Sequence, residues 1–588
     1  MERANFIESI ISKMNVQQKI GQCVVVGMSG TTITNDLREA IVRYHCSGVR
    51  LSPFTRIFRY FSDDKAKEMQ MGEGFVPSMQ KIAKAGAAPY LTPEQYTEML
   101  NELRDLAAKR DPAIPLHMVI DQEGDTSKDY SRGGVVQYPS SMGLVAGDSL
   151  ERAYEVARCV AKQMKAAGLD MIHSPVVDVN INPNNPEIGR RAFSDDPKVV
   201  AEYAIAMLKG YKEEGVVAAA KHFPGRGDSA TDAHHACPTL NVDSVRFNEI
   251  ELYPYKKLIE AGIDSIMVAH CVYPHIDEEH ISTVSRKIVH GLLREELGFE
   301  GVITTDSMTM GALIDKYGTG EACARSLAAG TDIILMKAEN KWRGEMFYCI
   351  EKWVEEGKID SKELDDKVRR IIGMKYDYGL FENMGKVDAS KASEPFSLPV
   401  VIETAKQTAQ SAILIAKDSL NAIPLDKSKK TLLINQLNTI KTPDDIHDHP
   451  ALFSEVLEKE WPELQTYETE FGCNDDDEKR VVEFVESNNY DLIICTNFYD
   501  RSKKPHTYVK ALIEKGYPVL LVSNTPYNIN GLGGMLPNAP SIVLNMNLTP
   551  EGLRSTAEVL LGRLEAKGKW PLSNYDPLSL NKESLQCK

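Results

Sequence analysis

The sequence predicts an α/β protein in which a (β/α)8 TIM-like barrel is followed by a C-terminal α/β sandwich domain. Three observations support this fold class. Eight short apolar runs alternate with longer amphipathic stretches over about residues 15–375. A segment rich in Ser, Lys and Pro interrupts the pattern after about residue 383, and five further apolar runs follow it. At 588 residues the chain is long enough for a barrel and a companion domain.

The eight apolar runs in the first part of the chain are the predicted barrel strands. Each is rich in β-branched or small apolar residues and is too short for a buried helix. Helix-like segments lie between them, and the one at 91–110 has Thr92 as N-cap candidate and Pro93 at its first helical position. The runs are CVVVG (23–27), GVRLS (48–52), LHMVI (116–120), MIHSPVV (171–177), VVAAAKHF (216–223), SIMVAHCVY (265–273), GVITT (301–305) and IILMK (333–337).

The domain boundaries follow from these patterns. We expect a TIM-like catalytic barrel over residues 1–382, a linker over 383–400 and the C-terminal α/β sandwich domain over 401–588. An insertion at about 57–90 lengthens the connection between the second and third strands, on the face where barrel enzymes bind substrates. This insertion is either an excursion without a role or a lid or partner-contacting arm.

The five apolar runs of the second part predict an open, mostly parallel sheet, because helical stretches such as 478–487 separate them. The runs are AILIA (412–416), TLLIN (431–435), DLIICTNF (491–498), PVLLVSN (518–524) and SIVLNMN (541–547).

Composition and charge narrow the classes of partner. Lys and Arg number 68 and Asp and Glu 84, so the formal net charge is −16, and such an acidic surface repels nucleic acid and anionic membranes. The N-terminus lacks the basic and apolar regions of a secretory signal, and no apolar run approaches the roughly 20 residues that cross a bilayer. The ten cysteines are scattered without a CxxC pair, which is typical of reduced thiols. We therefore expect a cytoplasmic protein without nucleic-acid or membrane partners, and leave homo-oligomer formation open.

Polar side chains follow most of the predicted barrel strands. Barrel enzymes carry their active sites at the C-terminal ends of the strands, so these residues should meet at one mouth. One or two of them could merely satisfy backbone groups, but six polar strand ends favour an active site. The candidates are Asp121, Gln122 and Glu123 after the third strand, Asp178, Asn180 and Arg191 after the fourth, Lys221 and His222 in the fifth, His270 after the sixth, Asp306 after the seventh and Lys337 after the eighth.

Nucleotide-cofactor and serine-hydrolase signatures are missing from the sequence. There is no glycine-rich dinucleotide turn, no GxxxxGK[ST] loop and no GxSxG elbow. We therefore expect no cofactor.

The segment KHFPGRGDSATDAHH (221–235) is the most informative one for chemistry. On a loop, Asp232 can bond one imidazole nitrogen of His234 and leave the other facing a substrate, which fixes the tautomer and raises the basicity of the ring. A zinc site is the competing interpretation, because Asp228, His235 and Cys237 are also metal-capable, but the spacing is not a standard one and we expect no metal. A solvated polar loop is the third interpretation.

Four long motifs, in order, resemble glycoside hydrolase family 3, in its bacterial β-N-acetylhexosaminidase branch. The branch stretch IDQEGG is similar to IDQEGD here, and DVNxNPxNPxIGxRxF is similar to DVNINPNNPEIGRRAF. The branch loop KHFPGHGDxxxDSH is similar to KHFPGRGDSATDAH, and GVITTDSMTM fits the segment around the seventh strand. The resemblance covers the barrel and continues into the start of the second domain.

The resemblance implies a retaining exo-β-glycosidase that forms a covalent glycosyl-enzyme and removes terminal β-linked N-acetylglucosamine from small glycosides. It makes Asp306 the nucleophile, His234 the acid/base and Asp232 the residue that orients His234. It assigns the sugar hydroxyls to four further residues. These are Asp121, Arg191, Lys221 and His222.

Alternatives within the same family are a β-glucosidase and a β-glycoside phosphorylase. A neutral histidine repels phosphate less than a carboxylate would, so phosphate could replace water as the acceptor. A non-catalytic sugar-binding protein is the alternative from a different class. The sequence departs from the branch at Asp125, Arg226 and Ala233, and these departures leave the exact sugar open.

Overall fold

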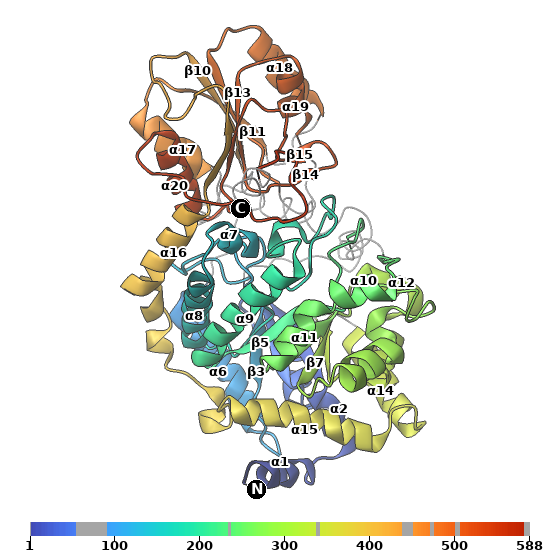
Figure 1. The fold of residues 1–588 in the computed structure, drawn as a ribbon. Coiled ribbons are helices and arrows are strands. Elements are labelled where there is room, and N and C mark those ends of the chain that lie inside the picture. The colour runs from blue at the N-terminus through green and yellow to red at the C-terminus, as the bar shows by residue number, and fades with distance from the viewer. Residues whose placement is uncertain are drawn as a thin grey trace.

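The computed structural model describes residues 2–53, 91–232, 237–336, 342–437, 451–470, 475–499 and 506–580. Eight parallel strands close into a barrel in sequence order, with β1 pairing β2 on one side and β8 on the other. Figure 1 shows the barrel below the second domain. The predicted TIM-like barrel is therefore confirmed. Its strands are β1 (Val24–Ser29), β2 (Gly48–Ser52), β3 (His117–Ile120), β4 (Met171–Ile172), β5 (Val217–Phe223), β6 (Ser265–Val268), β7 (Val302–Ser307) and β8 (Ile333–Met336).

Each predicted apolar run overlaps one of these strands, but β4 is much shorter than the run 171–177. Pro175 has no N–H to donate to a ladder, so regular pairing stops before it. Val176 keeps only an isolated bridge to Lys221. The chain after β4 thereby turns early into the loop that carries Asp178 and Arg191.

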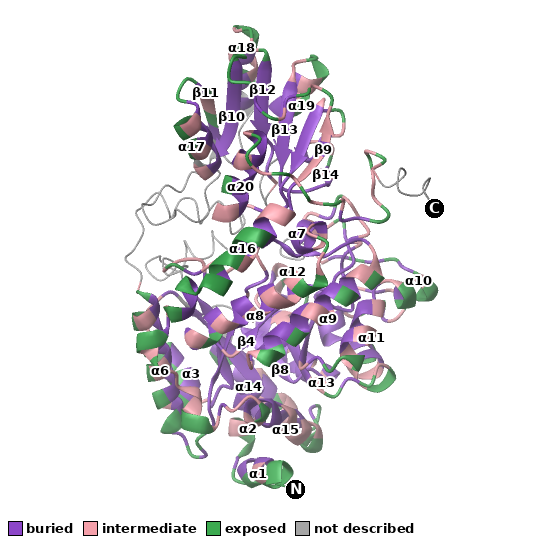
Figure 2. Ribbon diagram, turned by 60° about the vertical axis from the view of Figure 1, so that its left-hand side comes forward, coloured by how far each residue is buried: buried purple, intermediate pink, exposed green. Residues whose placement is uncertain are grey.

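Helices surround the barrel in the outer layer (Figures 1 and 2). The helix predicted at 91–110 is observed as α6 (Pro93–Ala108), and Thr92 and Gln95 form a capping box at its start. A π-helical segment, Lys287–Glu296, precedes β7. The other helices of the barrel are α1 (Glu2–Ile11), α2 (Val16–Gln22), α3 (Asn35–Val42), α7 (Ser141–Ala146), α8 (Leu150–Ala166), α9 (Pro197–Glu213), α10 (Ser244–Glu249), α11 (Tyr253–Glu260), α12 (Gly311–Tyr317), α13 (Thr319–Ala329), α14 (Trp342–Glu355) and α15 (Ser361–Asp377).

The second domain is a six-stranded sheet in the order β11-β10-β12-β13-β16-β9. All neighbouring strands are parallel except β9, which pairs antiparallel with β16 at one edge, so the mostly parallel sheet is as predicted. Its strands are β9 (Leu414–Asp418), β10 (Thr431–Leu437), β11 (Gln465–Glu470), β12 (Leu492–Thr496), β13 (Val519–Ser523) and β16 (Ser541–Leu544), and a small hairpin is formed by β14 (Asn528–Ile529) and β15 (Gly533–Gly534).

Helices cover both faces of this sheet, which makes the domain an α/β sandwich. Successive residues of a strand point to opposite faces. In β10, Leu432 and Ile434 pack with α18 (Asp475–Glu486) and α19 (Thr507–Glu514). Leu433 packs on the other face, with α17 (Ala451–Glu460) and α20 (Pro550–Leu560).

The segment between the two domains consists of short 3-10 turns and of α16 (Pro399–Ser411), which packs against α8 of the barrel and α20 of the second domain (Figure 1). The exact boundaries at residues 382, 400 and 401 stay a prediction. The predicted insertion at 57–90 lies outside the described residues, so its role also stays open.

The second domain sits on the loops that follow β3 and β4. Ser140 Oγ donates to Met546 O (2.9 Å), and the Leu548 N–H donates to Asp125 Oδ2 (2.7 Å). The Asp195 carboxylate accepts the backbone N–H groups of residues 573–575 at 2.7–2.9 Å. The C-terminal domain is therefore anchored next to the mouth of the barrel.

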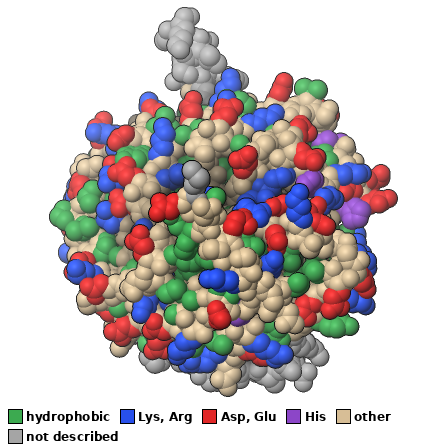
Figure 3. Space-filling view, turned by 90° about the horizontal axis from the view of Figure 1, so that it is seen from below, with side chains coloured by type: hydrophobic (Ala, Val, Ile, Leu, Met, Phe, Trp, Pro, Cys, Tyr) green, Lys and Arg blue, Asp and Glu red, His purple; other side chains and the backbone are tan. Residues whose placement is uncertain are grey.

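No helix in the described parts of the chain is both long and apolar enough to span a bilayer. Seen from below the view of Figure 1, the surface mixes acidic and basic side chains without a patch of one sign (Figure 3).

Candidate active site

The site is built where β3, β5 and β7 end at the mouth of the barrel. Asp121 follows β3, and its Oδ1 lies 3.1 Å from Lys221 Nζ of β5 and 3.2 Å from His173 Nδ1. Its Oδ2 pairs with the guanidinium of Arg50, a wholly buried residue of β2 that also contacts Asp129 at 2.5 Å. Asp121 is thus held by cations from two strands.

Glu123 forms the centre of the buried part of the site. Nε and Nη2 of Arg191 donate to the two carboxylate oxygens of Glu123 at 2.8 and 2.9 Å. Lys221 Nζ lies 2.5 Å from Glu123 Oε1. Burial alone would raise the pKa of this carboxyl, but the charges of Arg191 and Lys221 outweigh burial and lower the pKa to about 2. Glu123 is therefore ionised at every working pH and fixes both cations.

His222 and Asp178 form a second buried pair, with Nδ1 to Oδ2 at 2.7 Å. Burial raises the pKa of Asp178 to about 6 and lowers the pKa of His222 well below its usual value. The other carboxylate oxygen of Asp178 accepts the backbone N–H of Arg226 at 2.7 Å. The imidazole is therefore neutral and held in one orientation, with its second nitrogen available to bond a hydroxyl.

Arg226 and Glu187 connect this cluster to Asp306 at the end of β7. Arg226 Nη2 lies 2.8 Å from Glu187 Oε1 and 3.7 Å from Asp306 Oδ2, and Arg191 Nη1 lies 3.6 Å from Glu187 Oε1. The backbone N–H of Ser307 donates to Asp306 Oδ1 at 2.7 Å. Acidic and basic side chains therefore alternate across the mouth from Asp121 to Asp306, through Lys221, Glu123, Arg191, Glu187 and Arg226.

Exposure separates the carboxylates that a ligand can reach from those that only hold the site together. The side chains of Asp121 and Asp306 are 16 and 17% exposed, whereas those of Glu123 and Glu187 are 4 and 2% exposed. Asp306 can therefore meet an electrophilic carbon at the mouth. Asp121 can accept hydrogen bonds from hydroxyl groups there.

Residues 15–374 match the family described as "Glycosyl hydrolase family 3 N terminal domain". The chain belongs to glycosyl hydrolase family 3. The family prediction is thereby confirmed.

The chain is also similar to curated relatives and to solved structures. The chain is 32% identical to "Beta-hexosaminidase A" of Pseudoalteromonas piscicida over 304 residues, which are 48% of this chain and 50% of that protein. It is 27% identical to "Beta-N-acetylglucosaminidase/beta-glucosidase" of Cellulomonas fimi over 326 residues, 54% and 57% of the two chains. The match thus spans about half the length of these relatives.

Among solved structures, a glycoside hydrolase family 3 β-N-acetylglucosaminidase from Paenibacillus sp. str. FPU-7 aligns with a TM-score of 0.78 at 25% identity, over 95% of this chain and 99% of that one. The "Beta-glucoside phosphorylase BglX" aligns with a TM-score of 0.77 at 21% identity, over 98% and 97%. The similarity to the phosphorylase shows that the two proteins share a fold.

The structure brings together most of the site residues that the family 3 motifs predict. Asp121, Arg191, Lys221, His222 and Asp306 lie in one charge network. Asp232 is buried in the loop after β5. His234 and His235 lie outside the described residues, so the proposed pairing of Asp232 with His234 and the zinc alternative both stay predictions.

Sequence reasoning did not single out Arg50, His173 and Glu187. Arg50 stands inside the apolar strand run GVRLS, and a charged residue inside a buried strand is itself a signal that it has a partner. Glu187 and His173 carried no such local signal. Their roles depend on loops that meet only in the folded barrel.

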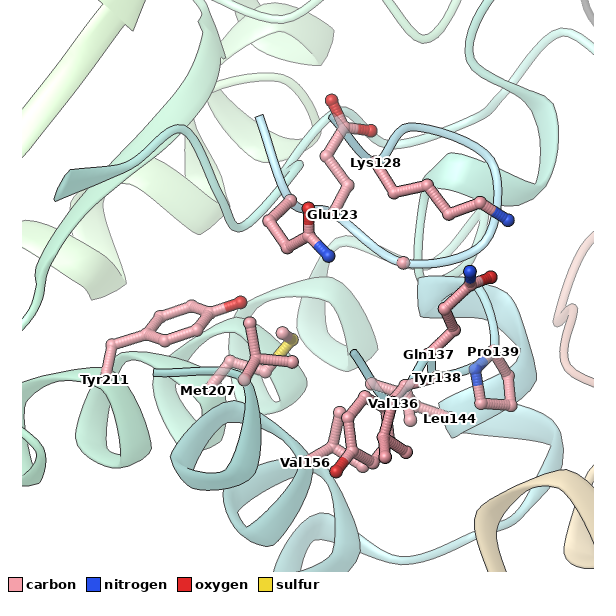
Figure 4. A pocket seen from close by; sticks show the side chains of 13 residues that line it. Glu123, Lys128, Val136, Gln137, Tyr138, Pro139, Leu144, Val156, Met207 and Tyr211 are labelled. Atoms are coloured by element: carbon pink, nitrogen blue, oxygen red, sulfur yellow. The ribbon is translucent and has the colours of Figure 1, made fainter. Parts of the chain in front are cut away.

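A small cavity lies next to the site (Figure 4). Glu123 and Lys128 line one side of it, and Val156, Met207 and Tyr211 line the other. Its walls from α8 and α9 are mostly apolar, and Glu123 is the one residue that it shares with the charge network. It is therefore not the place where Asp306 and Asp121 would meet a substrate.

Proposed function

We propose that this protein is a retaining exo-β-glycosidase that hydrolyses terminal β-linked N-acetylglucosamine from small glycosides through a covalent glycosyl-enzyme. The observation that carries the proposal is the reachable Asp306 carboxylate at the end of β7, at one end of a network that reaches Asp121 on the opposite loop. The names of the relatives support N-acetylglucosamine as the sugar.

Asp306 attacks the anomeric carbon, and His234 donates a proton to the glycosidic oxygen as the bond to the leaving group breaks. His234, now neutral, takes a proton from water in the second step. An imidazole with an ordinary pKa of about 6.5 can serve both steps near neutral pH, and Asp232 holds it in the required tautomer.

The charge network favours an uncharged sugar. Lys221 pairs with Asp121 and Glu123, and Arg191 pairs with Glu123 and Glu187. Three carboxylates thus balance the two cations, so the remaining N–H groups of Lys221 and Arg191 can bond sugar hydroxyls without a net positive field. His222 and Asp121 add an imidazole nitrogen and a carboxylate oxygen to the same surface. Hydrogen bonds from such charged donors contribute about 1.5–3 kcal/mol each.

Phosphorolysis is the second candidate function. A neutral imidazole on the acceptor side repels phosphate less than a carboxylate does, and the fold is shared with a beta-glucoside phosphorylase. In that case phosphate takes the place of water in the second step and the product is a sugar phosphate.

The eight cysteines in the described part of the chain are all free thiols. Free thiols suit a reducing compartment, so we propose that the activity is cytoplasmic.

The decisive experiment measures a panel of p-nitrophenyl β-glycosides with and without phosphate. Higher kcat/KM on the N-acetylglucosaminide than on the glucoside supports the proposed sugar, and a rate that depends on phosphate identifies phosphorolysis. Asp306→Ala should lower kcat by at least about 10³-fold, with partial rescue by azide as a glycosyl azide. Asp105→Ala, an exposed carboxylate of α6, is the control. Near wild-type turnover of Asp306→Ala would exclude the assignment.

A further inference from the structure

Arg226 occupies an unusually fixed place in the loop after β5. Its backbone N–H donates to Asp178 and its carbonyl accepts the Asn185 side-chain amide at 3.0 Å. The next residue, Gly227, lies so close to Val179 that a Cβ there would be 1.7 Å from the Val179 carbonyl oxygen. The loop therefore packs closely against the chain after β4, and these contacts hold the Arg226 backbone in place.

The buried guanidinium of Arg226 lies between two carboxylates. Its Nη2 contacts Glu187 at 2.8 Å and Asp306 at the longer distance of 3.7 Å. Two other buried cations at the mouth, Arg191 and Lys221, have their shortest ion pairs with Glu123, although Arg191 also lies 3.6 Å from Glu187. The charge of Arg226 is therefore shared between Asp306 and Glu187, and Glu187 has the shorter contact.

We propose that Arg226 is a positioning residue that sets how readily Asp306 leaves the anomeric carbon, and that Glu187 tunes this effect by drawing part of the Arg226 charge away. The inference rests on the proposed function, because it assigns a role within the covalent mechanism.

The affected step is the hydrolysis of the glycosyl-enzyme. A water oxygen bonds to the anomeric carbon, the bond between that carbon and the Asp306 oxygen breaks, and its electron pair stays on the Asp306 carboxylate. The water proton goes to His234. Asp306 is uncharged as an ester and negative after release, so a neighbouring guanidinium stabilises the released form and favours this step. For the same reason, the guanidinium makes the Asp306 carboxylate a weaker nucleophile in the first step, in which the carboxylate loses its negative charge.

Several other titratable groups face Arg226. Asp178 accepts its backbone N–H, His222 bonds Asp178, and Glu187 pairs with its guanidinium. Cys271, in the segment after β6, and Tyr255 of α11 also lie near it. Asp178, with a pKa of about 6, is the group among these that could itself produce an acidic limb in a pH profile. The experiment therefore includes a readout of the covalent intermediate as well as pH profiles.

The test compares Arg226→Met, Arg226→Lys and Glu187→Gln with wild type on an activated aryl N-acetylglucosaminide. Arg226→Met should lower kcat about 10-fold while kcat/KM near pH 7 does not fall, and intact-mass spectrometry should find more enzyme carrying the sugar adduct at steady state. The acidic limb of kcat/KM should rise by about 1 pH unit, because an Asp beside an Arg has a pKa lowered by about 1–3. Arg226→Lys keeps the charge and should restore most of both properties.

Glu187→Gln should have the opposite effect, because the Arg226 charge is no longer shared. The acidic limb of the kcat/KM profile should move to lower pH, and less enzyme should carry the sugar adduct. This variant keeps the proposal testable if Arg226→Met does not fold. Arg246→Met is the matched control, since Arg246 lies on α10 and pairs with Asp228 and Glu251. It should leave the limb and the adduct fraction as in wild type.

Equal adduct fractions and equal acidic limbs in wild type, Arg226→Met and Glu187→Gln would overturn the proposal. Equal losses of kcat and kcat/KM with an unchanged pH profile would assign Arg226 a purely structural role and overturn it as well. Failure of the proposed function gives a different result, because wild type itself then forms no adduct at Asp306.

Discussion

Removing the carboxylate of Asp125 should weaken the attachment of the C-terminal domain to the barrel. Asp125 is buried, pairs with the buried Arg190 and accepts the Leu548 N–H of the second domain at 2.7 Å. Asp125→Gly leaves Arg190 as an uncompensated buried charge, which costs about 3–5 kcal/mol, and leaves the Leu548 N–H unsatisfied, which costs about 1–3 kcal/mol more. We therefore expect a loss of about 4–8 kcal/mol.

Asp125→Asn separates the two contributions. Its amide oxygen can still accept the Leu548 N–H, so the expected loss is near the lower bound for a broken buried pair, about 3 kcal/mol. Lys569→Met is the control, because Lys569 pairs with Asp148 across the same two domains but the two side chains are 69 and 58% exposed, so the change should cost at most about 1 kcal/mol.

The assay is urea-induced unfolding combined with limited proteolysis of the linker region. The expected order of stability is wild type and Lys569→Met first, then Asp125→Asn, then Asp125→Gly. An unfolding midpoint of Asp125→Gly equal to that of Lys569→Met would refute the reasoning, because a buried charge would then have lost its partner without cost.

Three further predictions concern Asp195, Glu123 and His234. Asp195→Ala should release the segment at 573–575, whose three N–H groups it accepts, and make the C-terminal tail sensitive to protease. The lowered pKa of Glu123, about 2 in the folded state against about 4.5 unfolded, should contribute about 3 kcal/mol of stability above pH 4.5, which is lost as the pH falls towards 2, and Glu123→Gln should remove this dependence in acid titrations. His234→Ala should slow glycosides with poor leaving groups far more than activated aryl glycosides, whereas His235→Ala should not, and a chelator should leave wild type active.

The barrel could be predicted from the sequence because its signal is local and repeated. Each short apolar run between amphipathic segments indicates a buried parallel strand, and each of the eight runs overlaps one. Strand length was less predictable, since the run at 171–177 contains Pro175 and ends its ladder early. β11 was not predicted because its residues, QTYETE, are mostly polar, lie at a sheet edge and form no apolar run.

The site residues that end a strand could be predicted from the sequence. Lys221, His222 and Asp306 each follow or end a strand, and barrel topology alone places them at one mouth. Their partners were not predictable in the same way. Glu187 lies in the long loop after β4, and only the folded barrel brings it to Arg226. Arg50 reaches Asp121 through the direct pairing of β2 with β3, whose register the apolar runs alone do not fix.

Two of the three departures from the family motifs, Asp125 and Arg226, show why the partners of a site residue can be identified only from the fold. Motif alignment identifies Asp125 and Arg226 as substitutions, and taken alone each would be a charge placed in a buried loop. In the structure each has acquired partners that are distant in sequence, Arg190 and Leu548 for Asp125, and Glu187 and Asp306 for Arg226. A buried charge persists only where such partners exist, so the substitution and its partners form one unit. Differences between this protein and its relatives in domain attachment and in the behaviour of Asp306 should therefore follow these two groups of contacts, and changing one member alone should be more damaging than exchanging the whole group.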